Sequence, residues 1–424
     1  YKNRLYKKES KDGINVIRVL SYITESKGFV SQIIDYLIRG NEQSNLNKPL
    51  SYSYIANPDQ TIRWIYPSKL KVPTFLNFYN SSSLRAKIFT VTIKILFALK
   101  LSNLIKSNKV YLPIHEGSLL QRILDKYPDY NHSIFTGTVG KNRKIIVELN
   151  NGYKSLVFAK VAISNTSKDL IQNEFHVLSK LKHENLTSIY VPEVLAYNEK
   201  DLLEISNIKP KRYNQPSKLI DVQIAALTQV NGINHKHIKW KNMREKHEIE
   251  DLIGNLKVKV IVDNGLDRQR IDSYLEKISL LHKIINNETS LSCGLAHGDF
   301  TPWNMYVNHE KLYIYDWELS KENMPVLFDL FHYIFQSEVM IKRSDYAYVK
   351  NEIGRVLGLI STKQLIRKFD VDININFIFY LIYISSYYID IYSEQKELHT
   401  QAFWLFKVWN DAVSDALDSP NGIF

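Results

Sequence analysis

The sequence predicts an α+β protein in which a strand-rich segment in the middle of the chain precedes a mainly helical C-terminal part. Residues 133–162 predict three strands, because short apolar runs alternate with turn residues that include glycine and asparagine. Segments 217–233, 270–285 and 325–341 carry apolar residues at intervals of three and four, the repeat of an amphipathic helix. We therefore expect a β-rich part followed by a helical part.

The strand-rich segment contains a glycine turn and a single lysine in an apolar strand. Its first strand runs into Gly137 and Gly140, and Asn151-Gly152 predicts a two-residue hairpin between the second and third strands. The third strand, SLVFAKVAI, holds Lys160. A lysine in such a place either extends from the sheet edge into water or is directed at a partner.

A helix is predicted directly after this strand. Residues 165–167 supply N-cap candidates, and apolar residues recur at near-helical spacing as far as Leu181. Glu174 lies where a helix packed on the third strand could reach the ammonium group of Lys160. Taken singly, each is an ordinary exposed charge. Because Lys160 and Glu174 occur in this order ahead of Asp299 and Asp316, the sequence favours an ion pair between them.

The most informative run is His297 to Asn304 (HGDFTPWN), which Asp316 follows twelve residues later. The intervening MYVNHEKLYIY predicts a β-hairpin with a three-residue loop. Counting back from that loop places Asn304 opposite Asp316, with both side chains on one face. An amide oxygen and a carboxylate so placed can hold Mg²⁺, which keeps most of its shell for water and phosphate. Asp299 would lie beside the ion, free to accept a proton from a substrate hydroxyl.

These motifs resemble those of the aminoglycoside phosphotransferase and choline kinase branch of the protein-kinase-like fold. HGDFTPWN and IYDWE are similar to its catalytic and metal-binding motifs, and FAKV and NEFHVLSKLKHENL to its small lobe. The resemblance covers residues 131–424. It implies a bilobal fold with a β-rich small lobe (131–208) and a mainly helical large lobe (209–424), which an N-terminal α/β accessory region (1–125) precedes.

In the C-terminal lobe, the resemblance implies Asp299 as the catalytic base and Asn304 and Asp316 as Mg²⁺ ligands. Asp316 is followed by Trp and Glu instead of Phe and Gly, and no Ala-Pro-Glu element follows. Both departures point away from protein kinases and toward a small-molecule acceptor. Glu318 is expected either to support the metal shell or to hydrogen-bond the loop. We expect structural roles for three further residues, namely His297 and Asp329 as anchors of the catalytic loop and Cys293 as a buried side chain.

In the small lobe, the resemblance implies that Lys160, held by Glu174, binds the α- and β-phosphates of ATP or GTP. Gly137 and Gly140 would cover the phosphates. Two glycines fall short of the three in G-x-G-x-x-G, so this loop is the part of the resemblance that the sequence supports least.

Composition limits the remaining alternatives. The net charge is +11, but the lysines are scattered and no aromatic-basic recognition module is found, so we expect no nucleic-acid partner. An anionic substrate, a nucleotide or peripheral contact with an acidic membrane surface explains the sign equally well. A single cysteine fits the reducing cytoplasm, and neither a transmembrane run nor a signal peptide is evident.

The N-terminal 125 residues are the hardest to interpret. Residues 1–40 resemble a fragment of the N-terminal domain of a GT4-class glycosyltransferase, and 40–49 (GNEQSNLNKP) predicts a linker. The sugar-nucleotide domain that such an enzyme needs does not follow. The helix in residues 83–105 is expected to pack on the small lobe, because Lys87, Lys94 and Lys100 do not share one helix face.

The sequence therefore predicts an ATP- and Mg²⁺-dependent phosphotransferase that acts on a hydroxyl of a small molecule. A sugar, an amino alcohol or a glycan precursor is the expected acceptor class. A catalytically silent nucleotide-binding or scaffold protein of the same fold is the alternative, and a sugar-nucleotide transferase is a third reading. Oligomeric state is not set by the sequence.

Overall fold

The structure is a computed structural model that describes residues 34, 36–39, 50–57, 62–78, 84–102, 105, 108–137, 140, 142–198, 201–258, 268–395, 398 and 400–424. The chain forms two compact units. Unit 1 comprises residues 1–175 and 193–207, and unit 2 comprises residues 176–192 and 208–424. Most of the glycosyltransferase-like fragment (1–40) and all of the predicted linker (40–49) lie outside the described residues.

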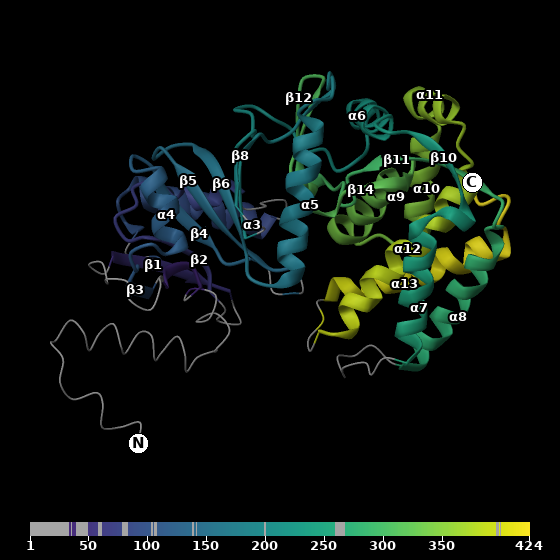
Figure 1. Ribbon diagram of the computed structural model, residues 1–424, viewed down its shortest axis with the longest axis horizontal. Coiled ribbons are helices and arrows are strands. Elements are labelled where there is room, and N and C mark those ends of the chain that lie inside the picture. Colours follow the sequence, from purple (N-terminus) through teal and green to yellow (C-terminus); the bar gives the residue numbers. More distant parts are fainter. Residues whose placement is uncertain are drawn as a thin grey trace. The chain divides into compact units, whose positions relative to one another are not determined.

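Unit 1 is built on one eight-stranded sheet with the order β3-β1-β2-β4-β5-β6-β9-β8 (Figure 1). All of its strand pairs are antiparallel. The strands are β1 (Leu50–Ala56), β2 (Ile62–Pro67), β3 (Asn108–Leu112), β4 (Asn131–Phe135), β5 (Lys144–Asn150), β6 (Ser155–Ala162), β8 (Val194–Asn198) and β9 (Leu202–Ser206). Because β2 pairs with β4, the sheet continues across the boundary that was predicted between residues 125 and 131.

The three strands predicted within residues 133–162 are confirmed as β4, β5 and β6. The turn between β5 and β6 differs from the prediction, because it spans residues 151–154 instead of two residues. Its reason is local. The Asn151 side chain accepts hydrogen bonds from the backbone N–H groups of Tyr153 and Lys154, and this Asx turn lengthens the connection.

In the described part of unit 1, the helical segments with defined bounds are η1 (Thr74–Phe78), α3 (Leu84–Ala98), α4 (Leu119–Lys126) and the first part of α5 (Asn165–Leu181). Residues 34 and 36–38 are helical as well. The predicted helix after β6 is confirmed as α5. Its N-cap is Ser164, one residue before the predicted candidates, because the Ser164 hydroxyl accepts from the Ser167 N–H at 3.1 Å.

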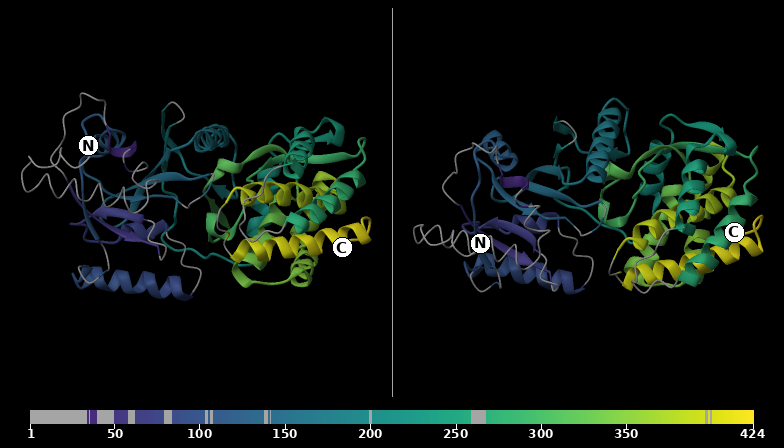
Figure 2. Two further views of the ribbon diagram at one scale, coloured as in Figure 1. Left: turned by 90° about the horizontal axis from the view of Figure 1, so that it is seen from below. Right: turned by 60° about the horizontal axis from the view of Figure 1, so that its bottom comes forward.

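Helix α3 lies along one side of unit 1 (Figure 2), where Ile93 and Phe97 pack with Trp64 and Tyr66 of β2. The helix was predicted to pack on the small lobe (131–208), but it packs mainly on β2 in the N-terminal region, and from the predicted small lobe Phe135 of β4 borders the same cluster. The opposite face carries an exposed aliphatic stripe at helical spacing, formed by Ile88, Val91, Ile95 and Leu99.

Unit 2 is mainly helical and contains two small sheets, β10-β11-β14 and β12-β13-β7. The strands are β7 (Ile189–Tyr190), β10 (Lys236–Lys239), β11 (Ser290–Ala296), β12 (Met305–Asn308), β13 (Lys311–Ile314) and β14 (Lys321–Pro325). The α-helices are α6 (Asp221–Asn231), α7 (Arg244–Val258), α8 (Arg268–Ile284), α9 (Phe328–Phe335), α10 (Tyr346–Leu357), α11 (Ile360–Phe369), α12 (Ile373–Ser393) and α13 (Thr400–Asp418). Short 3₁₀ helices are η3 (Trp240–Asn242), η4 (Pro302–Asn304) and η5 (Trp317–Leu319), and the π-helix η6 is Gln336–Lys342.

The helices predicted from periodicity are α6, α8, and α9 continued by η6. Helix α12 is buried along most of its length and packs against α7, α8, α9 and α13. The α+β class and its division into a β-rich and a mainly helical part are confirmed. Among the described residues, none of the helices combines the length and the apolarity that crossing a bilayer requires.

A buried hydrogen bond joins two strands of the unit 1 sheet. The hydroxyl of Tyr52 on β1 and Nε2 of His132 on β4 lie 2.8 Å apart, and both residues are buried. Burial lowers the pKa of His132 to about 4 from 6.5. As the pH falls below 6.5, the unfolded chain takes up a proton that the folded chain does not, so the folded state loses stability.

We predict that His132→Gln makes the stability of the chain less sensitive to acid. Between pH 7.5 and 5, the native chain should lose about 2 kcal/mol more free energy of unfolding than this variant does. Urea unfolding at the two pH values measures this difference. His183→Gln, at an exposed histidine, is the control and should behave like the native chain. Equal acid sensitivity of His132→Gln and the control would contradict the prediction.

Candidate active site

The backbone of the loop that follows β11 is held by one buried carboxylate. Asp329, at the start of α9, accepts the backbone N–H of His297 at 2.6 Å and that of Gly298 at 3.0 Å. Burial raises the pKa of Asp329, while the nearby His297 and the two N–H donors act in the opposite direction. The predicted anchoring role of Asp329 is therefore present in the structure.

Gly298 allows the loop to pass close to η5. Its φ is +82°, a left-handed conformation that side chains disfavour. A Cβ atom at this position would lie 2.1 Å from the carbonyl oxygen of Leu319. Only glycine fits both the conformation and this close approach.

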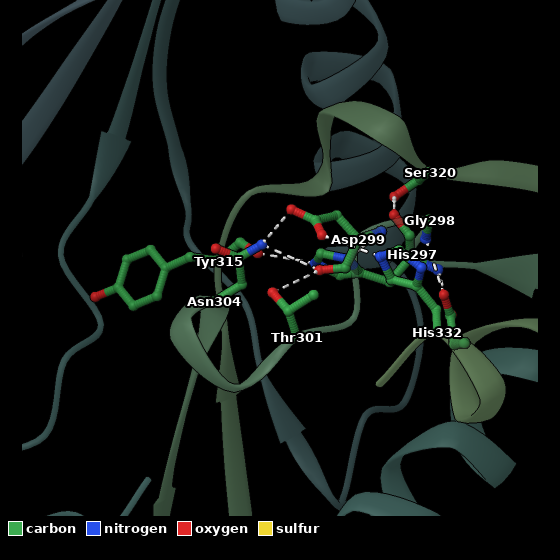
Figure 3. Close-up of polar contacts among 9 residues, drawn as sticks. His297, Gly298, Asp299, Thr301, Asn304, Tyr315, Ser320 and His332 are labelled. Carbon is green, nitrogen blue, oxygen red and sulfur yellow. Dashed lines mark hydrogen bonds and ion pairs between the residues drawn. The ribbon is translucent and has the colours of Figure 1, made fainter. Parts of the chain in front are cut away.

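His297 joins the loop to the segment that precedes Asp316. Its Nδ1 accepts from the N–H of Asp299 at 3.2 Å, so the ring proton is on Nε2. Nε2 then donates to the carbonyl oxygen of Tyr315 at 2.8 Å (Figure 3). His297 thus orients the backbone on both sides of the site, in keeping with its predicted structural role.

The carboxylate of Asp299 is held by a donor at each oxygen. Nδ2 of Asn304 donates to Oδ2 at 2.8 Å, and Nε2 of His332 lies 3.3 Å from Oδ1. Figure 3 shows the Asp299 and Asn304 side chains pointing toward each other. The Asp299 side chain is 23% exposed, so its remaining lone pairs are accessible to a substrate.

The predicted register of the following hairpin is wrong by one residue. Its turn has two residues, His309 and Glu310, because Asn308 pairs with Lys311. His309 adopts a positive φ of 53°, which lets so short a turn reverse the chain. Asn304 consequently pairs with Tyr315, whose N–H donates to the Asn304 carbonyl at 2.8 Å, instead of lying opposite Asp316.

Asp316 lies beyond the end of β13 and turns the chain into η5. Its φ is +65°, a conformation that Asp tolerates better than most residues. A carboxylate oxygen of Asp316 and one of the buried Glu318 lie within 4.8 Å of each other. Two carboxylates at this spacing are the hard oxygen donors that Mg²⁺ prefers.

Asn304 supplies a further oxygen of the right kind. Its Nδ2 donates to both the carbonyl and the carboxylate of Asp299, at 3.0 and 2.8 Å. The Nδ2 end of the amide therefore faces Asp299, and the Oδ1 end faces away from it. These residues therefore offer oxygen donors of the kind that Mg²⁺ prefers, although Asn304 and Asp316 do not pair across the hairpin as predicted.

In unit 1, Lys160 and Glu174 form the predicted ion pair. The Lys160 ammonium contacts both carboxylate oxygens of Glu174, at 2.7 and 2.6 Å. Their side chains are 6% and 0% exposed. Burying both charges costs desolvation free energy, so the pair is weak evidence for added stability. A functional role therefore explains its presence better.

The glycine turn follows β4. Gly137 has a φ of +77°, and a Cβ there would lie 2.2 Å from the carbonyl oxygen of Lys144 on β5. Arg143, which is buried, donates from Nε to the carbonyl of Thr136 at 2.8 Å and closes the turn. Gly140 is exposed, with φ +154°. These contacts give Gly137 a packing role that is independent of any phosphate.

Sequence reasoning did not find His332 or Tyr388. Both lie in apolar helical segments, where they look like ordinary core residues. Burial and the negative charge of Asp299 raise the pKa of the Tyr388 hydroxyl on α12. The spacing of His332, three residues after Asp329, is the only signal that could have found it.

Comparisons with solved structures identify proteins of the kinds that the motifs resemble. An ethanolamine kinase from Plasmodium vivax matches with a TM-score of 0.44 and 11% identity, over 82% of this chain and 96% of the kinase. An ADP-bound aminoglycoside phosphotransferase matches with a TM-score of 0.41 and 12% identity, over 69% and 97%. A type I macrolide 2'-phosphotransferase matches with a TM-score of 0.38 and 12% identity, over 71% and 91%. No protein-family model and no curated protein matches the chain.

We predict that Gly298→Ala destabilises unit 2 by about 2 kcal/mol or more, because the added methyl group is strained and meets the Leu319 carbonyl. Chemical denaturation measures the change. Gly254→Ala in α7 is the matched control, since a Cβ there meets nothing within 4 Å. That exchange should stabilise the helix by about 0.5–1 kcal/mol. A Gly298→Ala protein as stable as the native chain would contradict the clash.

Proposed function

We propose that the protein is an ATP- and Mg²⁺-dependent phosphotransferase whose acceptor is a hydroxyl group of a small molecule. The observation that carries this proposal is the Asp299 carboxylate, which is accessible to substrate and fixed by a donor at each oxygen. A carboxylate so fixed is suited to orient an acceptor hydroxyl and to take its proton. The oxygen donors Asn304, Asp316 and Glu318 from the adjoining segments support the same reaction.

In the proposed reaction, the acceptor hydroxyl donates a hydrogen bond to Asp299. Its oxygen attacks the γ-phosphorus, the bond from that phosphorus to the β–γ bridging oxygen breaks, and ADP leaves. The hydroxyl proton passes to Asp299 late in the transfer. Phosphoryl transfer depends mostly on positioning and on charge neutralisation, so the fixed orientation of the carboxylate is its main contribution.

Asn304 and Asp316 would hold the magnesium ion, with Glu318 beside them. When bound, Mg²⁺ neutralises charge on the β- and γ-phosphates. Lys160 is proposed to contact the α- and β-phosphates, with Glu174 keeping its ammonium in place. Gly137 and Gly140 are proposed to cover the phosphates, an assignment supported only by their positive φ and their place in the β4–β5 turn.

The acceptor class is proposed to be a sugar, an amino alcohol or a glycan precursor. The decisive experiment incubates the purified protein with γ-labelled ATP, Mg²⁺ and a panel of these acceptors. Transfer of label to an acceptor supports the proposal. Nucleotide binding without transfer or hydrolysis would favour the silent nucleotide-binding alternative instead.

We predict that Asp299→Asn lowers turnover by about 10²-fold or more while nucleotide affinity changes little. The amide keeps the size of the side chain but cannot accept the proton. Steady-state kinetics and a nucleotide titration separate the two effects. Full turnover in Asp299→Asn would rule out the assigned base.

We predict that Asp316→Ala impairs nucleotide binding, so that ATP binds more weakly when Mg²⁺ is present. The reason is that an ion ligand is lost while the base is retained. Calorimetric titration with Mg²⁺ and with EDTA measures the effect. If the native chain and Asp316→Ala bound ATP equally well in Mg²⁺, the ligand assignment would be wrong.

A further inference from the structure

We infer that His332 is the positioning residue of the base: a neutral imidazole that donates to Asp299 Oδ1 and keeps the carboxylate oriented toward the acceptor. This inference rests on the proposed function, because it gives Asp299 the role of base. It concerns a residue to which the sequence motifs assign nothing.

The position of His332 in α9 makes this contact rigid. His332 follows Asp329 by three residues, so both side chains leave the same face of the helix and meet the same loop. The His332 ring stacks on Phe328, with centroids 6.2 Å apart and planes at 7°, and meets the edge of Tyr380 at 6.3 Å. Its side chain has no solvent exposure.

The hydrogen-bond geometry sets the protonation of the ring. A carboxylate can only accept, so the Nε2 that lies 3.3 Å from Asp299 Oδ1 must carry a proton. Nδ1 is buried, and no group in the described part of the chain bonds to it. A second proton on Nδ1 would leave a buried donor unsatisfied, whereas a bare lone pair there is less costly. The neutral ring with its proton on Nε2 therefore fits the site.

The two donors to the Asp299 carboxylate, His332 and Asn304, differ in their other partners. Asn304, which donates to Oδ2, is also a proposed ligand of the cation, so its amide serves two partners. Among the described residues, the side-chain polar contact of His332 is with Asp299 alone. When the acceptor hydroxyl arrives, His332 can hold Oδ1 whether or not the ion is bound, and the carboxylate does not need to be reoriented in the transition state.

The kinetic test compares three variants of the full chain. His332→Leu removes the donor and should lower kcat by about 10- to 100-fold, with the KM for ATP changed less than about twofold. His332→Gln restores an N–H donor near the Nε2 position and should recover most of the turnover. His282→Leu makes the same exchange at another helical histidine, which packs on Trp240, and should leave kcat unchanged. Equal kcat values in His332→Leu and His282→Leu, or no recovery with Gln, would overturn the inference.

A second measurement needs no activity. In protein labelled with ¹⁵N-histidine, the imidazole signal that disappears in His332→Gln should have the shifts of a neutral ring protonated at Nε2. It should move when Asp299 is replaced by Asn. A ring protonated at Nδ1, or a signal indifferent to Asp299→Asn, would overturn the inference. If the native chain transfers phosphate to no acceptor, the proposed function fails, and the NMR result alone decides whether His332 holds Asp299.

Discussion

The candidate active site depends on one buried carboxylate that is not itself exposed to substrate. Asp329 has no solvent exposure and binds two successive N–H groups of the loop after β11. Two donors on one carboxylate fix the direction in which the chain leaves that strand. The left-handed turn at Gly298 and the position of Asp299 both follow from this direction. The loop after β11 is thereby built as an extension of a helix N-terminus, where negative charge is favoured.

Unit 1 partners its buried carboxylates in two different ways. Lys160 and Glu174 neutralise each other in unit 1. Glu148, also in unit 1 and fully buried, accepts hydrogen bonds from the neutral side chains of Ser133, Ser155 and Asn150. Burial raises the pKa of Glu148, and these donors oppose the rise. Polar groups within a sheet of this kind fix its register, because a slip would leave them unpaired.

Much of this arrangement could be read from the sequence, and the failures have physical causes. Apolar periodicity located β4–β6, α5, α6 and α8, because burial of one face leaves a regular pattern. Hairpin register could not be read, since His309 can take a left-handed turn that no rule requires of it. His332 was missed because it lies within the apolar helix α9. The sequence of such a helix does not show which residue its one polar side chain will contact in the fold. Tyr388 escaped notice for the same reason.

The chain passes between the two units at residues 175–176, 192–193 and 207–208. Strands β8 and β9 thus complete the unit 1 sheet only after the chain has contributed β7 to unit 2. A fragment that stopped at residue 175 would lack both strands and leave the backbone of β6 as an unprotected edge, open to pairing with other molecules. Synthesis on the ribosome creates that same intermediate for a short time. Until residues 193–207 emerge, the nascent chain therefore lacks the strands that cover this edge of β6.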